Sequence, residues 1–264
     1  MPSAYAHNKF GKQVYAHLPK ELKELVRKYP HHYRMGLHGP DPLFFYWPMK
    51  SNKITEYAKR LHKDDPLPFF QKAAAIVNEN GIDSASHAYM LGYLCHYTLD
   101  KKCHPLVNSS INATGCFHVE IEGDLEQYLI TLDGHTPESY PIHKLFPTKD
   151  GIAQTMSLFW PDATVEQIQT SINLMYLIKK MIVAPDSVRR TIVDTIAHIS
   201  YEEMKGHMIM PEPNPKCRHI SEELYAMFPE AVTIACSRVN EFENAIMYNT
   251  PLSDDFHGNF SNRY

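Results

Sequence analysis

Residues 88–122 read AYMLGYLCHYTLDKKCHPLVNSSINATGCFHVEIE, and the rest of the chain is organised around them. Imidazole and carboxylate side chains recur in this stretch at intervals of four. They are His96, Asp100 and His104, then, after a turn that contains Pro and Asn, His118 and Glu122. Residues four apart lie on one face of an α-helix. The spacing therefore predicts two helices, over 84–104 and 116–132, each with a stripe of these groups.

Imidazole and carboxylate are the ligands that Zn²⁺ accepts in catalytic sites. The rest of the first helix is apolar, which is typical of a helix buried among others. Its apolar residues are Met90, Leu91, Leu94 and Leu99. Polar groups on a buried helix are costly unless they are paired or ligated. A single His-x3-Asp pair would favour core histidines satisfied by one salt bridge. Five such residues in adjacent segments favour a metal site.

The composition is that of a globular protein with a sizeable core. The chain has 264 residues, of which 44% are apolar and 21% are charged. This length permits one large domain, and we expect a single domain over 1–264. The net charge of −4 gives no general attraction to nucleic acid or anionic membrane. We therefore expect no stable nucleic-acid partner, and the oligomeric state stays open.

The cysteines and the start of the chain bear on the compartment. Five cysteines, an odd number without a C-x-x-C pair, make a disulfide framework unexpected and reduced thiols the expectation. The first residues, MPSAYAHNKFGK, contain no apolar signal-peptide core, and no stretch approaches the length of a membrane span. These features predict a cytoplasmic protein without a transmembrane segment.

Apolar residues at helical spacing predict further helices along the chain. They cover residues 4–28, 53–80, 164–183, roughly 187–209 and 219–248. We interpret His198 and Glu202 as a surface pair on one of these helices. Residues 133–163 are rich in Pro, Gly, Asp and Thr and indicate a loop with short helical turns, and the C-terminal tail is polar. No run of alternating strands is present, so the predicted class is all-α.

Three candidate ligands stand apart from the central stretch. His7 lies where the first helix starts, and His62 lies in the helical region 53–80; each alone is typical of an ordinary surface histidine. Asp41 follows Gly39-Pro40 in a tight turn, where it would cap the next helix or, equally, bridge metal ions. The aromatic block 44–47 after it would wall a pocket or pack in the core.

Four pieces of sequence together resemble the zinc-dependent phospholipase C family, whose fold is shared with fungal single-strand-specific zinc nucleases. They are AHNKFGKQV around His7, GPDPLFFY around Asp41, the histidine at position 62, and LGYLCHYTLDKKCHP followed by His118-x3-Glu122. The motifs cover roughly residues 4–130. The C-terminal half resembles the family only as a helical continuation.

The resemblance implies a cleft with two or three Zn²⁺ ions. By position, one ion would be bound by Asp41, His62, His96 and Asp100, a second by His104, His118 and Glu122, and a third by His7 and Asp100, with Asp100 bridging. Secreted members complete the third site with an N-terminal Trp, and this chain has no Trp near its start. Fe²⁺ and Mn²⁺ are alternatives for the same ligands.

The resemblance also implies a hydrolase of phosphate esters. The expected reaction is phospholipase C-like hydrolysis of a phosphodiester by a metal-bridging hydroxide, with Asp41 as the residue that ligates and orients the water. The substrate would be a phosphate-ester small molecule or a phospholipid, in contact with Phe44, Phe45 and Tyr46. Two alternatives remain: a zinc nuclease- or nucleotidase-like phosphodiesterase, and a non-catalytic, metal-stabilised protein that binds a phosphate-bearing ligand.

Overall fold

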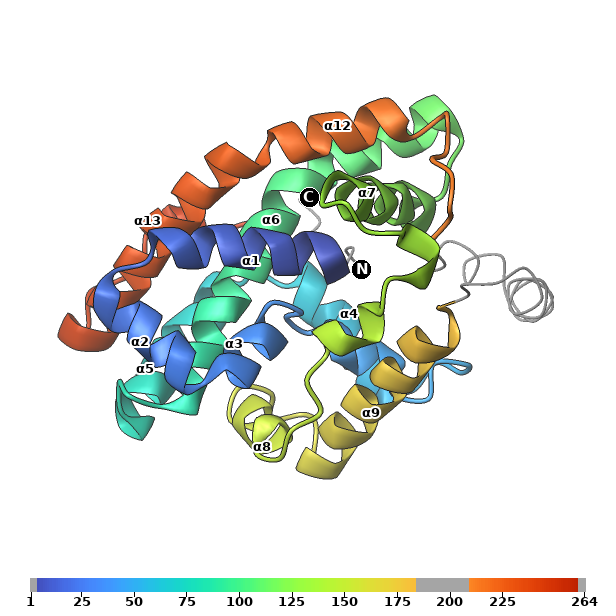
Figure 1. Cartoon of the computed structure of the whole chain (residues 1–264). Helices are drawn as coiled ribbons and strands as arrows, with labels where there is room; N and C mark the ends of the chain where they lie inside the picture. The colour runs from blue at the N-terminus through green and yellow to red at the C-terminus, as the bar shows by residue number, and fades with distance from the viewer. Residues whose placement is uncertain (1–3, 184–208, 261–264) are drawn as a thin grey trace.

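The computed structural model describes residues 4–183 and 209–260, and in these ranges it contains helices and no strand. The predicted all-α class is therefore confirmed for the described residues. The longest helix, α6 (Ala85–Thr114), passes through the middle of the molecule (Figure 1). Every residue from Ser86 to Asp100 is buried, as the apolar composition of this stretch predicted.

The boundaries of α6 follow local chemistry at both ends. The Ser84 hydroxyl accepts a hydrogen bond from the His87 backbone N–H (3.3 Å) and caps the start. Gly115 ends the helix in the left-handed conformation that glycine adopts without penalty. The turn predicted after His104 is wrong, because the helix continues through Pro105 for nine more residues, to Thr114. Buried residues beyond the proline, such as Val107, supply packing that offsets the lost backbone hydrogen bond.

In the described ranges, α6 is accompanied by α3, which is treated below, and by nine other α-helices and four 3-10 turns. The α-helices are α1 (Ala4–His17), α2 (Lys20–Lys28), α4 (Lys53–Lys63), α5 (Leu67–Asn80), α7 (His118–Leu132), α8 (Ile152–Ser157), α9 (Val165–Met181), α12 (Arg218–Ala226) and α13 (Phe228–Tyr248). The 3-10 turns are η1 (Asp41–Phe45), η2 (Pro137–Ser139), η3 (Ile142–Leu145) and η4 (Asp254–Phe256). The region 133–163 thus contains η2, η3 and the short helix α8 between loop segments, which agrees with the predicted loop with short helical turns.

Helix α3 (Pro30–Gly36) crosses α6 at a pair of glycines. A Cβ atom on Gly36 would lie 2.1 Å from the Tyr89 carbonyl oxygen, and one on Gly92 would lie 2.1 Å from the Tyr33 carbonyl oxygen. The two backbones therefore approach more closely than any other residue type would permit. This crossing fixes the segment after α3, which carries Asp41, against the central helix.

Three predicted helices are each divided into two. The break falls at Pro19 between α1 and α2, at Pro66 between α4 and α5, and at the start of α13, where Pro229 occupies the first turn. Proline lacks a backbone N–H and disfavours a helical conformation in the residue before it. The ranges 4–28, 53–80 and 219–248 are therefore helical as predicted, but proline divides each of them into two helices.

The C-terminal tail also differs from prediction. Leu252, Phe256 and Phe260 are buried, although the tail reads as polar. The Tyr97 hydroxyl of α6 donates to the Gly258 carbonyl (3.0 Å), and the Arg238 guanidinium of α13 donates to the Asp255 carbonyl (3.0 Å). The tail is thus held against the central helix by three buried apolar side chains and by hydrogen bonds to its backbone.

The helix predicted over roughly 187–209, with His198 and Glu202, lies almost wholly outside the described residues. No described helix has the length and apolar character needed to cross a membrane. All five cysteines are free thiols, and Cys116 and Cys217 lie with their Sγ atoms 3.1 Å apart.

Candidate metal centre

The eight candidate ligands come from five elements and meet beside α6. His96, Asp100 and His104 lie along α6, and His118 and Glu122 lie on α7. His7 comes from α1, Asp41 from η1 and His62 from α4. Within the described residues they form three groups whose ligand atoms lie within 4.8 Å of one another: His7–His96–Asp100, Asp41–His62–His96 and His104–His118–Glu122.

The first two groups share His96. Asp100 directs one carboxylate oxygen toward each of two imidazoles: its Oδ1 lies 3.1 Å from His7 Nε2, and its Oδ2 lies 3.3 Å from His96 Nε2. The His7 and His96 rings stack with their centroids 4.5 Å apart. On the other side, Asp41 Oδ1 lies 3.0 Å from His62 Nε2. The two groups are therefore continuous.

The third group combines His104, one turn beyond Asp100 on α6, with two residues of α7. Glu122 Oε1 lies 2.7 Å from His118 Nε2 and 3.4 Å from His104 Nε2. The His118 side chain retains 28% of its exposure, whereas His104 and Glu122 are buried. This group is thus the most exposed of the three.

The spacing of the donor atoms fits zinc. Ligand atoms about 2.1 Å from a tetrahedral ion are separated from one another by roughly 3.4 Å. The five imidazole–carboxylate distances in the three groups run from 2.7 to 3.4 Å. Five imidazoles and three carboxylates also make the donor set of catalytic zinc sites, without a thiolate.

Backbone carbonyls fix the tautomers of two of these histidines. His62 Nδ1 lies 2.8 Å from the Ala58 carbonyl, and His104 Nδ1 lies 2.6 Å from the Phe260 carbonyl. A carbonyl oxygen can only accept a hydrogen bond, so Nδ1 carries the proton, and Nε2 of the neutral ring presents its lone pair. In His62 that lone pair faces an Asp41 oxygen 3.0 Å away. Two lone pairs at this distance repel unless a proton or a metal ion lies between them.

The deepest imidazoles carry nitrogens that nothing in the described part of the chain satisfies. Nδ1 of His7 and of His96 has no hydrogen-bond partner there. Nε2 of His7, His96 and His104 lies 3.1 to 3.4 Å from a carboxylate oxygen but in a geometry that makes no hydrogen bond. Buried polar atoms without partners are costly and uncommon in native proteins. A ligated metal ion removes that cost. These unsatisfied nitrogens therefore support a metal site, in addition to the spacing of the donor atoms.

The electrostatics of the cluster keep the ligands in the forms that bind metal. Burial lowers the pKa of His96 to about 4, although the Asp100 carboxylate opposes the shift. Burial raises the pKa of Asp41 and of Asp100, but the neighbouring imidazoles, led by His96, outweigh it and hold both pKa values below their usual range. At neutral pH His96 is therefore neutral and both carboxylates are ionised, as metal ligation requires.

The turn that carries Asp41 is shaped to approach His96. Gly39 has a φ of +50°, and a Cβ atom at this position would lie 2.2 Å from Cδ2 of the His96 ring. Glycine is therefore required both by the backbone conformation and by the close approach. The capping interpretation of Asp41 is wrong, because its carboxylate makes no cap hydrogen bond and instead faces His62.

The structure adds two residues that sequence reasoning missed. His38 is buried, with its ring 4.4 Å from that of Phe146, and burial together with nearby His7 lowers its pKa to about 3. Phe260 holds His104 through its carbonyl, and its ring lies 5.2 Å from that of His62 and 5.6 Å from that of His96. The His-Gly-Pro-Asp order could have indicated His38, but no sequence signal points to Phe260.

The three predicted substrate-contacting aromatics lie in different environments. Phe44 is half-buried, with its ring centroid 5.1 Å from that of His62. Phe45 is buried in the core, and Tyr46 is half-buried. Phe44 is therefore the one in contact range of a candidate ligand.

Comparison with known protein families gives one match. The family described as zinc dependent phospholipase C matches residues 6–180, about two thirds of the chain. The matched span contains all eight candidate ligands. No curated protein and no solved structure matches the chain.

Proposed function

The chain belongs to the zinc-dependent phospholipase C family, and from that premise we propose that it is a metal-dependent hydrolase of phosphodiesters that acts in the manner of a phospholipase C. The observation that carries the proposal is the continuous stripe of three imidazole–carboxylate groups along α6 and its neighbours. A non-catalytic site would need only one closed ligand set.

The proposed centre holds two or three Zn²⁺ ions. His62, His96, Asp41 and Asp100 would hold one ion, His104, His118 and Glu122 a second, and His7 with Asp100 a third. When bound, zinc supplies Lewis-acid activation of water and neutralises charge on the phosphate oxygens. Fe²⁺ or Mn²⁺ would suit the same ligands.

The side chains of the protein then have distinct roles. Asp41 stands on a turn that Gly39 presses against His96, so its carboxylate is well placed to hold and orient the attacking water. His118, the most exposed ligand, marks the side from which substrate enters. Phe44 lies beside His62 and would contact the apolar part of a phospholipid or another phosphate ester.

The test is the variant Asp41→Asn, assayed with a soluble chromogenic phosphodiester in the presence of Zn²⁺. Asparagine keeps the shape of the side chain but loses the charge that orients water, so we expect activity to fall by at least about 100-fold while most of the metal is retained. The seven other proposed ligands are enough for two ions.

Rate and metal content are measured on the same preparation, with elemental analysis for the metal. A fully active variant would remove Asp41 from the mechanism. An inactive variant without metal would show that Asp41 is needed to hold the metal and would leave its part in catalysis unproven. A wild-type protein that binds zinc but turns over no phosphodiester would favour the non-catalytic, phosphate-binding alternative.

A further inference from the structure

A cavity of ≈ 440 Å³ lies between α1, α2, α3 and the end of η3, and none of the candidate metal ligands lines it. Its apolar wall is made by Val26, Leu37 and Leu145, all of which are buried. Its cationic side chains are Lys12, Arg27 and Arg34. The volume is in the range of small-molecule sites, and an apolar wall with a few charged groups is their usual lining.

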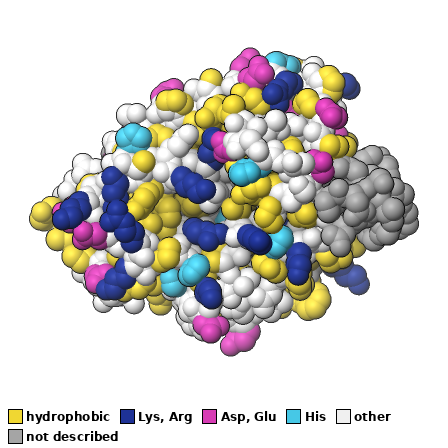
Figure 2. Space-filling model, in the orientation of Figure 1, with side chains coloured by type: hydrophobic (Ala, Val, Ile, Leu, Met, Phe, Trp, Pro, Cys, Tyr) yellow, Lys and Arg dark blue, Asp and Glu magenta, His cyan; other side chains and the backbone are white. Residues whose placement is uncertain are grey.

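The positive charge around this cavity is not neutralised within the described part of the chain. No carboxylate lines the cavity, and no described carboxylate forms an ion pair with Lys12, Arg27 or Arg34. Three other lysines of α1 and α2 are paired, Lys9 with Asp133, Lys20 with Glu24 and Lys28 with Asp83, whereas Lys23 of α2 forms no ion pair with a described carboxylate. Figure 2 shows Lys and Arg side chains on the face formed by these helices, with hydrophobic surface between them.

The side-chain amide of Asn8 also faces this cavity. Asn8 lines it and is only 6% exposed, and its side chain forms no hydrogen bond with another described residue. The amide atoms keep some accessible surface, so they are free to hydrogen-bond a ligand in the cavity. Asn8 and Lys12 are four residues apart on α1, so the amide and the ammonium group share one helix face.

The walls of the cavity are fixed before any ligand arrives. The Tyr33 hydroxyl donates to the Gly11 carbonyl (2.7 Å) and joins α3 to α1. The Arg34 guanidinium donates to the Lys144 carbonyl and joins α3 to η3. A preorganised site loses less entropy when it binds.

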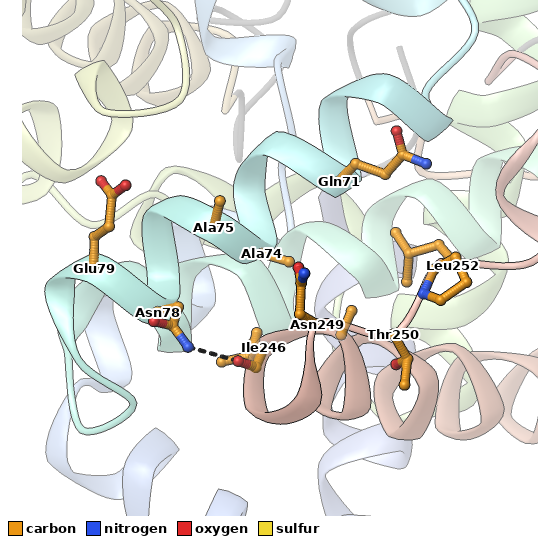
Figure 3. Close-up of a pocket in the computed structure, with 11 residues that line it drawn as sticks. Gln71, Ala74, Ala75, Asn78, Glu79, Ile246, Asn249, Thr250 and Leu252 are labelled. Carbon is orange, nitrogen blue, oxygen red and sulfur yellow. Dashed lines mark hydrogen bonds between the residues drawn. The ribbon is translucent and has the colours of Figure 1, made fainter.

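A second pocket, between α5 and α13, lacks these features (Figure 3). No cationic side chain lines it, and its Asn78 amide already donates to the Ile246 carbonyl (2.6 Å). Unneutralised charge and an unpaired amide thus coincide in the first cavity and not in this one.

We propose that the cavity between α1, α2 and α3 binds a small amphipathic organic anion, that is, a carboxylate, sulfonate or phosphate joined to an apolar group. The apolar group packs on Val26, Leu37 and Leu145. The anionic group accepts hydrogen bonds from the Asn8 amide and interacts with Lys12, Arg27 and Arg34. The site is separate from the metal centre, because His7 and Asn8 project from different faces of α1.

The probe is 1-anilinonaphthalene-8-sulfonate, whose fluorescence reports binding to an apolar site. Its neutral comparison is N-phenyl-1-naphthylamine, which has the same aromatic body without the sulfonate. We expect saturable binding of one sulfonate probe per chain, weaker binding of the neutral compound, and the same affinities in metal-free and zinc-loaded protein. A failure of the proposed hydrolysis would therefore leave this result unchanged.

The decisive variants are Lys12→Gln and Arg27→Gln, both at exposed positions. Each should weaken the sulfonate probe about three- to fivefold, as expected for a partly exposed charge pair, and the double variant should weaken it by about tenfold or more. Lys20→Gln on α2 is the matched control and should change nothing, because Lys20 lies outside the cavity.

Circular dichroism verifies that the variants fold. If the double variant does not fold, the probe affinities of the two single variants provide the test. Unchanged affinity in the Lys12 and Arg27 variants would overturn the proposal. Equal affinity for the neutral compound, or an equal loss in the Lys20 variant, would also overturn it.

Discussion

At the scale of single residues, the centre is a set of buried charges and imidazoles that need a cation. Among the described residues, the ion-pair partners of Asp41 and Asp100 are all imidazoles, and His7 and His96 keep unsatisfied ring nitrogens. Ligation converts these costs into binding free energy, and an ion that binds only the native state stabilises it.

The variants His96→Ala and His118→Ala should each lose about one bound ion per chain and most of the stabilisation that zinc provides, because each removes a ligand from one group. Elemental analysis and melting with and without Zn²⁺ give the two readouts. His87→Ala is the control, since His87 is also buried and lies 2.6 Å from a carboxylate of Glu243, outside the three groups. It should lower stability and keep the metal. Full metal content in the first two variants would refute the ligand assignment.

His38 should make the metal-free protein sensitive to mild acid. Its folded pKa of about 3 lies below its ordinary value of 6.5, so the unfolded chain binds the additional proton. The contribution of His38 to stability is therefore lost as the pH falls from about 6.5 toward 3. Between pH 7 and pH 5 this amounts to about 2 kcal/mol.

The variant His38→Gln tests this, because the amide does not titrate. Urea unfolding of metal-free protein at pH 7, 6 and 5 should show a smaller loss of unfolding free energy in the variant than in the wild type. Burial lowers the pKa of His96 too, so a residual slope of the same sign is expected. Identical slopes in both proteins would exclude His38 as a source.

At the scale of elements, the contact of α3 with α6 sets where Asp41 stands. Gly36 and Gly92 let the two helix backbones touch, and Gly39 then brings the turn onto the His96 ring. Both contacts are with backbone or with a buried ring, which cannot move aside as the end of an exposed side chain can. The position of the Asp41 carboxylate, which we propose orients water, therefore depends on glycine at all three positions.

Gly92→Ala should cost about 1–3 kcal/mol of stability through overpacking, because its Cβ would meet the Tyr33 carbonyl at 2.1 Å. Phosphodiesterase activity should fall more than zinc content, since α3 and Asp41 are displaced while the ligands of α6 and α7 remain. Gly92→Ser should be worse than Gly92→Ala. Wild-type stability in both variants would show that the helices separate at little cost.

At the scale of the whole molecule, the C-terminal tail closes the centre from the opposite end of the sequence. The Phe260 carbonyl holds the His104 ring, 156 residues away, and the Phe260 side chain packs beside His62 and His96. Partners that orient a ligating histidine tune its affinity for metal.

A chain that ends at His257 should bind metal about 10- to 100-fold more weakly at the His104 group. Phe260→Ala keeps the backbone carbonyl and should retain near-normal affinity, while it loses about 3–5 kcal/mol of stability from the buried ring. Competition with a chromogenic chelator measures affinity, and urea unfolding measures stability. Equal affinity in the truncated and full-length chains would contradict a role for the carbonyl.

The sequence by itself determined the local features of this protein. Helical periodicity gave the all-α class, and the four-residue spacing placed His96, Asp100 and His104 on one face of a buried helix and His118 and Glu122 on the next. These are properties of neighbouring residues on one helix, so the chain order contains them. The motifs around His7, Asp41 and His62 indicated the family, which the match over residues 6–180 confirms.

The tertiary structure alone decided how these segments meet. Helical propensity did not reveal that α6 continues through Pro105 or that the polar tail buries Phe260, because packing against distant elements outweighs local preference. The closeness of Asp41 to His62 depends on the crossing of α3 and α6 at two glycines, and glycine indicates no contact in the sequence until two backbones touch. The closeness of His7 to Asp100 depends on the packing of α1 against α6. The group that orients His104 is a backbone carbonyl, which every residue has, so the sequence could not indicate that Phe260 provides it.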